Sequence, residues 1–130
     1  MQKTTTSRQP VIAIVDDDEA VREALSSLIR SLGYAALKFS GGQELLDSPR
    51  RAEISCLVSD VQMPGMTGLE LYDRLVASGE PIPTIFVTAY PDEKGRDRAM
   101  NAGAFCYLKK PFAEEELISC IRAILERPGA

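Results

Sequence analysis

Short apolar segments alternate along the chain with longer stretches in which apolar residues recur every three or four positions. The apolar segments span residues 11–15, 34–39, 54–59, 83–88 and 105–108. Three of them consist almost entirely of Val, Ile, Leu, Phe and Cys, which is typical of parallel strands covered by helices on both faces. The alternation therefore predicts an α/β fold with one doubly wound parallel sheet of five strands.

The stretch after Asp18 has the pattern of a complete helix. Gly33 follows it at a position where a left-handed residue commonly ends a helix. We expect Asp18 to cap this helix or to lie in the preceding loop, without a role in metal binding. The apolar residues recur at helical spacing and form one stripe, made of Val21, Leu25, Leu28, Ile29 and Leu32.

Two further helices begin with residue pairs that have the spacing of a capping box. The pairs are Ser40 with Gln43 and Thr67 with Glu70, and each precedes a leucine-rich stretch. In a capping box the two side chains satisfy amide groups of the first helical turn that otherwise lack partners. We therefore expect helices to start near residues 41 and 68.

The last two helices differ in their expected stability. The stretch around residues 92–103 contains Gly95, which costs about 1 kcal/mol relative to alanine inside a helix, and it has few apolar residues, so we expect it to be the loosest helix. The final stretch starts with three glutamates, which favour the positive end of a helix. Its apolar face contains Leu117, Ile118, Ile121, Ile124 and Leu125.

Length and composition indicate a single domain. The chain has 130 residues, of which 45% are hydrophobic and 26% charged, and this balance is typical of soluble globular proteins. We expect residues 1–9 to form a flexible N-terminal tail, residues 10–127 to form the domain, and residues 128–130 to be its C-terminal end or the start of a linker.

Charge and residue usage exclude several classes of function. The net charge of −4 argues against direct binding of nucleic acid by this segment. No apolar run approaches the roughly 18 to 20 residues that span a bilayer, and residues 1–10 lack the apolar region of a secretory signal, so we expect a cytoplasmic protein without membrane contact. The absence of histidine excludes histidine triads, imidazole zinc sites and a phosphohistidine donor within this chain.

The three cysteines give no metal or redox signature. Cys56, Cys106 and Cys120 are odd in number and contain no CxxC pair. We expect them to be reduced and to act mostly as small buried hydrophobic residues.

Polar residues follow the predicted strands at the edge of the sheet where functional groups gather in doubly wound folds. Asp16 and Asp17 follow the first strand, Asp60 the third, Thr88 ends the fourth, and Lys110 lies just beyond the fifth. Neighbouring carboxylates repel one another unless a cation neutralises them, and an all-oxygen set favours Mg²⁺, with Mn²⁺ as an alternative, over zinc. Because Mg²⁺ also binds phosphate oxygens, the sequence predicts a site for a divalent ion and a phosphoryl group.

Four segments in order resemble the response-regulator receiver domain of two-component signalling: "VDDDEAVREAL", "LVSDVQMPGMTGLEL", "IFVTAY" and "YLKKPF". The resemblance covers residues 10–127. It implies a single (βα)5 flavodoxin-like domain with strand order 2-1-3-4-5. The segments "VDDDEAVREAL" and "TAYPDE" are similar to those of receivers of the nitrogen-fixation and nodulation regulator type. It stays open whether the chain stands alone or belongs to a longer DNA-binding regulator.

The resemblance implies a role for each polar residue at this edge. Asp60 would be phosphorylated by a phosphohistidine of a sensor histidine kinase or by a small acyl phosphate. Lys110 would pair with a phosphoryl oxygen, and the hydroxyl of Thr88 would move to contact another. The domain would catalyse its own phosphorylation and slow dephosphorylation without being an enzyme in the usual sense.

The metal ligands are also implied by the resemblance. Asp17 would bind Mg²⁺ directly, Asp16 mainly through a water molecule, and Asp60 together with the backbone carbonyl of Gln62 would complete the protein's contribution.

The resemblance also implies how the signal leaves the domain. The Lys110–Pro111 bond would be cis. Tyr107 would turn inward when Thr88 moves, although plain core packing of this tyrosine is the alternative. The face formed by the fourth helix, fifth strand and fifth helix would then change for an output domain, a partner protein or a second copy of the chain.

Gln62 and Tyr90 occupy the positions two residues beyond Asp60 and Thr88, which line the approach of water in this family. We predict that both modulate the rate of dephosphorylation, with Tyr90 shielding the phosphoryl group.

Two other functions compete with the switch. One is a Mg²⁺-dependent phosphohydrolase with an aspartyl nucleophile, although its usual Asp-x-Asp signature after the first strand is absent here. The other is a pseudo-receiver that binds partners without phosphate, against which the full polar set argues.

Overall fold

The computed structural model describes residues 9–126, which form one five-stranded parallel sheet with helices on both faces. The strands lie in the order β2-β1-β3-β4-β5, as the receiver resemblance implied. Their bounds are β1 Val11–Val15, β2 Ala35–Phe39, β3 Ile54–Asp60, β4 Thr84–Thr88 and β5 Cys106–Lys109. The helices are α1 Glu19–Ser31, α2 Gly42–Leu46, the 3-10 turn η2 Arg51–Glu53, α3 Gly68–Ala77, α4 Glu93–Ala102 and α5 Glu114–Glu126. The predicted α/β fold is confirmed.

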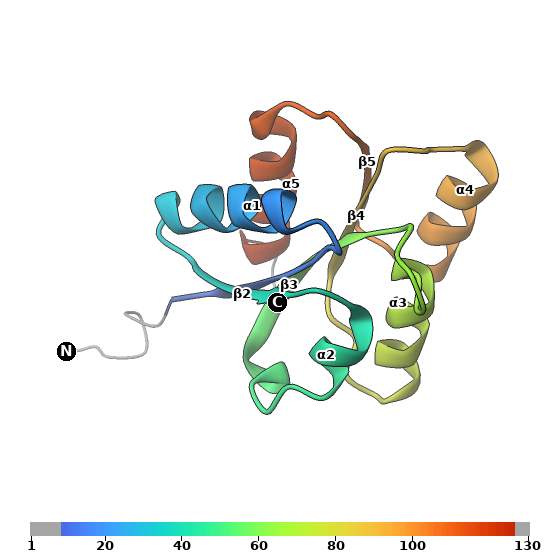
Figure 1. Cartoon of the computed structure of the whole chain (residues 1–130), viewed down its shortest axis with the longest axis horizontal. Helices are drawn as coiled ribbons and strands as arrows, with labels where there is room; N and C mark the ends of the chain where they lie inside the picture. The colour runs from blue at the N-terminus through green and yellow to red at the C-terminus, as the bar shows by residue number, and fades with distance from the viewer. Residues whose placement is uncertain (1–8, 127–130) are drawn as a thin grey trace.

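The two faces of the sheet carry different helices (Figure 1). Helices α1 and α5 lie over one face, while α2, α3 and α4 lie over the other. Strand β1 supplies both layers, because successive side chains of a strand point to opposite faces. Ile12 and Ile14 pack with residues of α1 and α5, whereas Ala13 and Val15 pack with residues of α2 and α3.

Three predicted helix ends are confirmed. The carboxylate of Asp18 accepts a hydrogen bond from the amide of Val21 at 3.2 Å and caps α1. Gly33 follows this helix with φ of 92°, in the left-handed region that glycine enters without steric cost. Thr67 and Glu70 form the expected capping box at the start of α3.

The expected capping box of Ser40 and Gln43 is wrong. Helix α2 begins at Gly42, and its cap is Gly41, which has no side chain to accept a hydrogen bond. Glu44 is therefore the third residue of the helix, and its carboxylate accepts hydrogen bonds from the amide and the hydroxyl of Ser40 at 2.7 and 3.1 Å. As in a capping box, the glutamate side chain accepts a hydrogen bond from an amide before the helix. The second bond of a capping box, from a helix amide to the side chain of the cap residue, is absent because the cap is a glycine.

The last two helices bury very different amounts of apolar surface. In α4 only Ala99 is buried, so its expected looseness stays a prediction with a structural basis. In α5 the predicted apolar face packs on the sheet, with Leu117, Ile121 and Ile124 buried. None of the helices within residues 9–126 has the length and apolar character needed to cross a bilayer.

The structure describes only part of the predicted terminal segments. Residues 1–8 of the expected tail and residues 127–130, which include the expected C-terminal end, lie outside the described residues.

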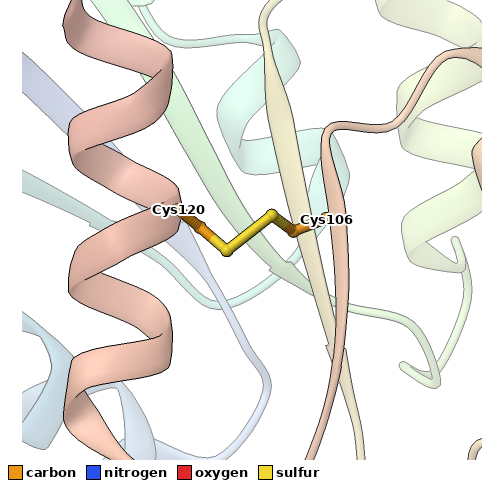
Figure 2. Close-up of a disulfide and its surroundings, with 2 residues drawn as sticks. All are labelled: Cys106 and Cys120. Atoms are coloured by element: carbon orange, nitrogen blue, oxygen red, sulfur yellow. A yellow bond between two sulfur atoms is a disulfide. The ribbon is translucent and has the colours of Figure 1, made fainter.

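The prediction of three reduced cysteines is wrong for two of them. Cys106 on β5 and Cys120 on α5 form a disulfide, with their Cα atoms 6.7 Å apart (Figure 2). Cys56 is free and fully buried as expected, and burial raises the pKa of its thiol to about 12. The pair was missed because α5 packs across β5 and brings together residues 14 positions apart, which no local spacing reveals.

Candidate functional site

Three carboxylates meet at the carboxyl edge of the sheet. Asp16 and Asp17 directly follow β1, and Asp60 is the last residue of β3. One carboxylate oxygen of each lies within 4.8 Å of those of the other two. Asp16 is 1% and Asp60 7% exposed, whereas Asp17 is open to solvent. The parallel sheet thus gathers the predicted acids into one small cluster that can hold a cation.

Lys110 brings a positive charge into this cluster. Its Nζ lies 3.0 Å from Oδ2 of Asp16 and 3.7 Å from Oδ2 of Asp60. The lysine follows β5, its amide donates to the carbonyl of Thr88 at 2.8 Å, and its bond to Pro111 is cis, as expected. Set against three ionised carboxylates, one ammonium leaves two negative charges, which is the charge that a divalent cation would neutralise.

Asp16 is held rigidly by bonds that the sequence did not reveal. Its Oδ1 accepts a hydrogen bond from the amide of Asp18 at 2.9 Å. The guanidinium of Arg22 on α1 donates to the backbone carbonyl of Asp16 at 2.7 Å. Arg22 was not among the predicted site residues. The sequence could have indicated its role, because Arg22 lies one turn after the acidic start of this helix.

The surroundings of Asp60 oppose its ionised form. Burial is the main cause that raises the pKa of this carboxyl, and the charges of Asp16 and Asp17 add to it. The ammonium of Lys110 and a hydrogen bond from the amide of Val61 act in the opposite direction. A cation bound by the acids would favour the ionised form, which is the form able to act as a nucleophile.

Thr88 joins the acidic cluster to the neighbouring loops. It is buried at the end of β4, and its hydroxyl donates to Oε1 of Gln62 at 2.6 Å and accepts from the amide of Tyr90 at 3.0 Å. The hydrogen bond between Thr88 and the side chain of Gln62 was not predicted, because the sequence assigned Gln62 only a backbone carbonyl for the metal ion and a place beside the approach of water. Tyr90 is 75% exposed, so its ring is available to cover the site or to contact a partner.

Tyr107 lies on β5. It pairs in register with Phe86, two residues before Thr88, and packs half-buried against the cluster that contains Tyr72, Phe86 and Ala99. Burial raises the pKa of its phenol. A Cβ atom at Gly95 would lie 3.2 Å from the Tyr107 hydroxyl, so the tyrosine lies against α4.

Gly68 is a second residue that the sequence did not reveal. A Cβ atom at this position would overlap the carbonyl oxygen of Asp60 and lie 3.1 Å from Oγ of Ser59. The amide of Gly68 donates to the carbonyl of Val61 at 2.9 Å. The start of α3 therefore packs directly against the end of β3. In the sequence, only the presence of a glycine at position 68, the last residue of "MPGMTG", could have indicated this close contact.

Comparison with known proteins agrees with this α/β fold and its acidic site. Residues 12–122 match the response regulator receiver domain, and the chain belongs to this family of two-component signalling proteins. The resemblance found in the sequence is confirmed.

Several regulators are similar to this chain. Response regulator protein TodT of Pseudomonas putida is 45% identical over 121 residues, which cover 93% of this chain and 53% of TodT. Nodulation protein W of Bradyrhizobium diazoefficiens is 37% identical over 124 residues, which cover 95% of this chain and 55% of that protein. The crystal structure of FixJ-N matches with a TM-score of 0.83 and 31% identity over 95% of this chain and 98% of that one. The chain thus spans about half the length of the curated relatives it matches.

Proposed function

We propose that this receiver is a phosphorylation-controlled switch in which Asp60 accepts a phosphoryl group from a sensor histidine kinase. The observation that carries this proposal is the ammonium of Lys110, placed 3.0 Å from Asp16 and 3.7 Å from Asp60 inside a cluster of three carboxylates. Such a charge arrangement stabilises a transferring phosphoryl group, which needs positioning and neutralisation more than covalent chemistry.

The donor set fits a hard divalent ion. Asp16, Asp17 and Asp60 would hold Mg²⁺ together with the backbone carbonyl of Gln62, with Mn²⁺ as an alternative ion. The bound ion would supply positive charge next to the phosphoryl oxygens. Within this chain, Asp18 and Arg22 keep Asp16 in place for that role.

Each remaining residue has a defined task in the transfer. A carboxylate oxygen of Asp60 attacks phosphorus, the P–N bond to the kinase histidine breaks, and the imidazole leaves with the bonding electrons. Lys110 shifts from Asp16 towards a phosphoryl oxygen. The hydroxyl of Thr88 exchanges its bond with Gln62 for one to the phosphoryl group.

The proposed output is a change at the face formed by α4, β5 and α5. When Thr88 moves, space opens beside Phe86 and Tyr107 turns inward, which alters its contact with α4. An output domain, a partner protein or a second copy of the chain would bind one form of this face preferentially. The lengths of TodT and nodulation protein W leave room for such an output domain beyond the matched region.

The phosphate-independent pseudo-receiver remains the competing function. A receiver that only binds partners has no use for an ammonium between two buried carboxylates. A turnover phosphohydrolase is disfavoured because the candidate nucleophile, Asp60, lies at the end of β3 rather than after β1.

The test is incubation of the purified chain with acetyl phosphate and Mg²⁺, followed by intact mass spectrometry. We expect one phosphoryl group on the wild type and none on Asp60→Asn or in the presence of EDTA. Unmodified wild-type protein would favour the pseudo-receiver, and sustained hydrolysis of phosphate monoesters would favour the phosphohydrolase.

A further inference from the structure

The disulfide between Cys106 and Cys120 closes a loop that contains a residue of the acidic site. The two cysteines are 14 positions apart, and Lys110 lies between them on the chain. The same loop includes the cis Lys110–Pro111 bond and the start of α5. The position of the Lys110 ammonium is therefore linked through a short closed loop to the state of two sulfur atoms.

Strand β5 connects the disulfide to the proposed output face as well. Cys106 and Cys120 pack with the side chains between the sheet and helices α1 and α5. Tyr107, the next residue on the strand, packs on the opposite face against the cluster that includes Ala99 of α4. A cross-link from β5 to α5, as Figure 2 shows, thus restrains the strand that carries Tyr107 and the helix that borders it.

The cross-linked pair is more accessible than the third cysteine. Cys106 and Cys120 are both half-buried, and β5 is an edge strand of the sheet. Cys56 lies on β3 in the centre of the sheet and is fully buried. This partial exposure favours attack by small thiols on the folded domain. Disulfides in the cytoplasm, where we expect this chain, are usually transient and redox-sensing rather than permanent.

We propose that Cys106 and Cys120 form a reversible redox site that exchanges with the glutathione couple, and that the closed disulfide slows phosphorylation of Asp60. The second part rests on the proposed function. Lys110 lies closer to Asp16 than to Asp60, so it must shift when a phosphoryl group arrives. The cross-link opposes this shift and the accompanying movement of β5 and α5.

The exchange is balanced in atoms and electrons. On oxidation, one cysteine thiolate attacks glutathione disulfide and releases one glutathione thiolate, which leaves a mixed disulfide on the protein. The second cysteine thiolate attacks the protein sulfur of that mixed disulfide and releases the second glutathione. Two protein thiols lose two protons and two electrons, and one glutathione disulfide becomes two glutathione molecules. Reduction follows the same steps in reverse.

The redox site is tested by equilibrating the folded chain at several ratios of reduced to oxidised glutathione. The samples are then quenched in acid, alkylated under denaturing conditions and weighed by mass spectrometry. We expect one alkylated thiol, Cys56, under oxidising conditions and three under reducing conditions. Three thiols at every ratio, a stable glutathione adduct without closure, or one thiol even in excess dithiothreitol would each overturn the proposal.

The coupling is tested by the rate of phosphorylation with acetyl phosphate in each redox state. We expect the reduced chain to react at least threefold faster than the oxidised chain. The Cys106→Ser/Cys120→Ser variant should react like the reduced chain at every glutathione ratio. Equal rates for both states of the wild type would refute the coupling.

The two proposals fail in different ways. Asp60→Asn should undergo the same redox transition without accepting phosphate. If the wild type shows the transition but no phosphorylation in either state, the proposed function fails and the redox site stands. If phosphorylation occurs but the thiol count never changes, the redox site fails alone.

Discussion

Asp60 illustrates at the scale of one residue how a candidate functional position opposes stability. Its carboxyl is buried beside two other acids, and Lys110 offsets only part of that cost. The same environment makes the residue responsive to a cation, because neutralising the cluster relieves the repulsion. Residues arranged for activity are commonly those whose replacement stabilises the fold.

We predict that Asp60→Asn stabilises the domain in EDTA at pH 7 by roughly 1 kcal/mol. The folded state raises the pKa of Asp60 above its ordinary value of 3.8, so ionisation of this group destabilises the fold as pH rises through the raised value. Well below pH 3.8 the carboxyl is protonated in folded and unfolded chains alike, and the gain should vanish. Urea unfolding of both proteins at pH 7 and at low pH measures the difference in their free energies of unfolding. An equal gain in stability at both pH values would contradict the electrostatic cause.

Tyr90 is the second residue with a specific expectation. Its ring is exposed, while its amide is anchored to the hydroxyl of Thr88 at 3.0 Å. We predict that the ring shields the phosphoryl group, so that phosphate loss from Tyr90→Ala is several-fold faster than from the wild type. The decay of phosphorylated protein after removal of acetyl phosphate is the measurement. Val76, also exposed but on α3, provides the control as Val76→Ala, and indistinguishable decay of Tyr90→Ala and wild type would refute shielding.

At the scale of elements, the site depends on how closely α3 approaches β3. Gly68 lets the first turn of α3 rest against the carbonyl of Asp60, while the capping box of Thr67 and Glu70 fixes where that turn begins. The helix therefore sets the backbone position of Asp60, the proposed site of phosphorylation, through packing rather than through a charged side chain.

We predict that Gly68→Ala destabilises the domain by about 1–3 kcal/mol, the usual cost of inserting a methyl group into a packed contact. The methyl group would overlap the carbonyl oxygen of Asp60, so α3 or the end of β3 must move. We also expect slower phosphorylation, because Asp60 shifts relative to Lys110. Gly41→Ala is the matched control, since a Cβ atom there meets nothing within 4 Å. Comparable stability losses in the two variants would exclude the close contact as the cause.

At the scale of the whole molecule, the sheet order decides which residues can share a cation. Strands β1 and β3 are neighbours although an entire strand and two helices separate them in the sequence, and this pairing brings Asp16 and Asp60 together. A ligand that binds only this assembled arrangement must stabilise the folded state, because the unfolded chain lacks the site.

We predict that Mg²⁺ at ten times its dissociation constant stabilises the wild type by about 1.4 kcal/mol. Asp17→Asn should lose most of this gain, since it removes the exposed ligand while leaving the buried pair intact. Thermal unfolding with and without Mg²⁺ gives the comparison, and Glu23→Gln on the surface of α1 serves as a charge-matched control. A gain that persists in full in Asp17→Asn would place the ion elsewhere.

The sequence by itself determined the elements and most of the site. The spacing of apolar residues in strands and helices is a local pattern, so the alternation along the chain located the ends of all five strands to within one residue. Asp16, Asp17, Asp60, Thr88 and Lys110 could be grouped because the strands of a parallel sheet deliver their carboxyl ends to one edge.

Tertiary structure decided the contacts that carry no local pattern. The disulfide between Cys106 and Cys120, the bond from Thr88 to Gln62 and the contact of Gly68 with Asp60 each join different elements. The distances between these residues depend on how a helix or loop packs on the sheet. The spacing of residues along the chain does not encode this packing. The start of α2 was misjudged for a related reason, because shifting a helix by one residue reassigns every capping partner.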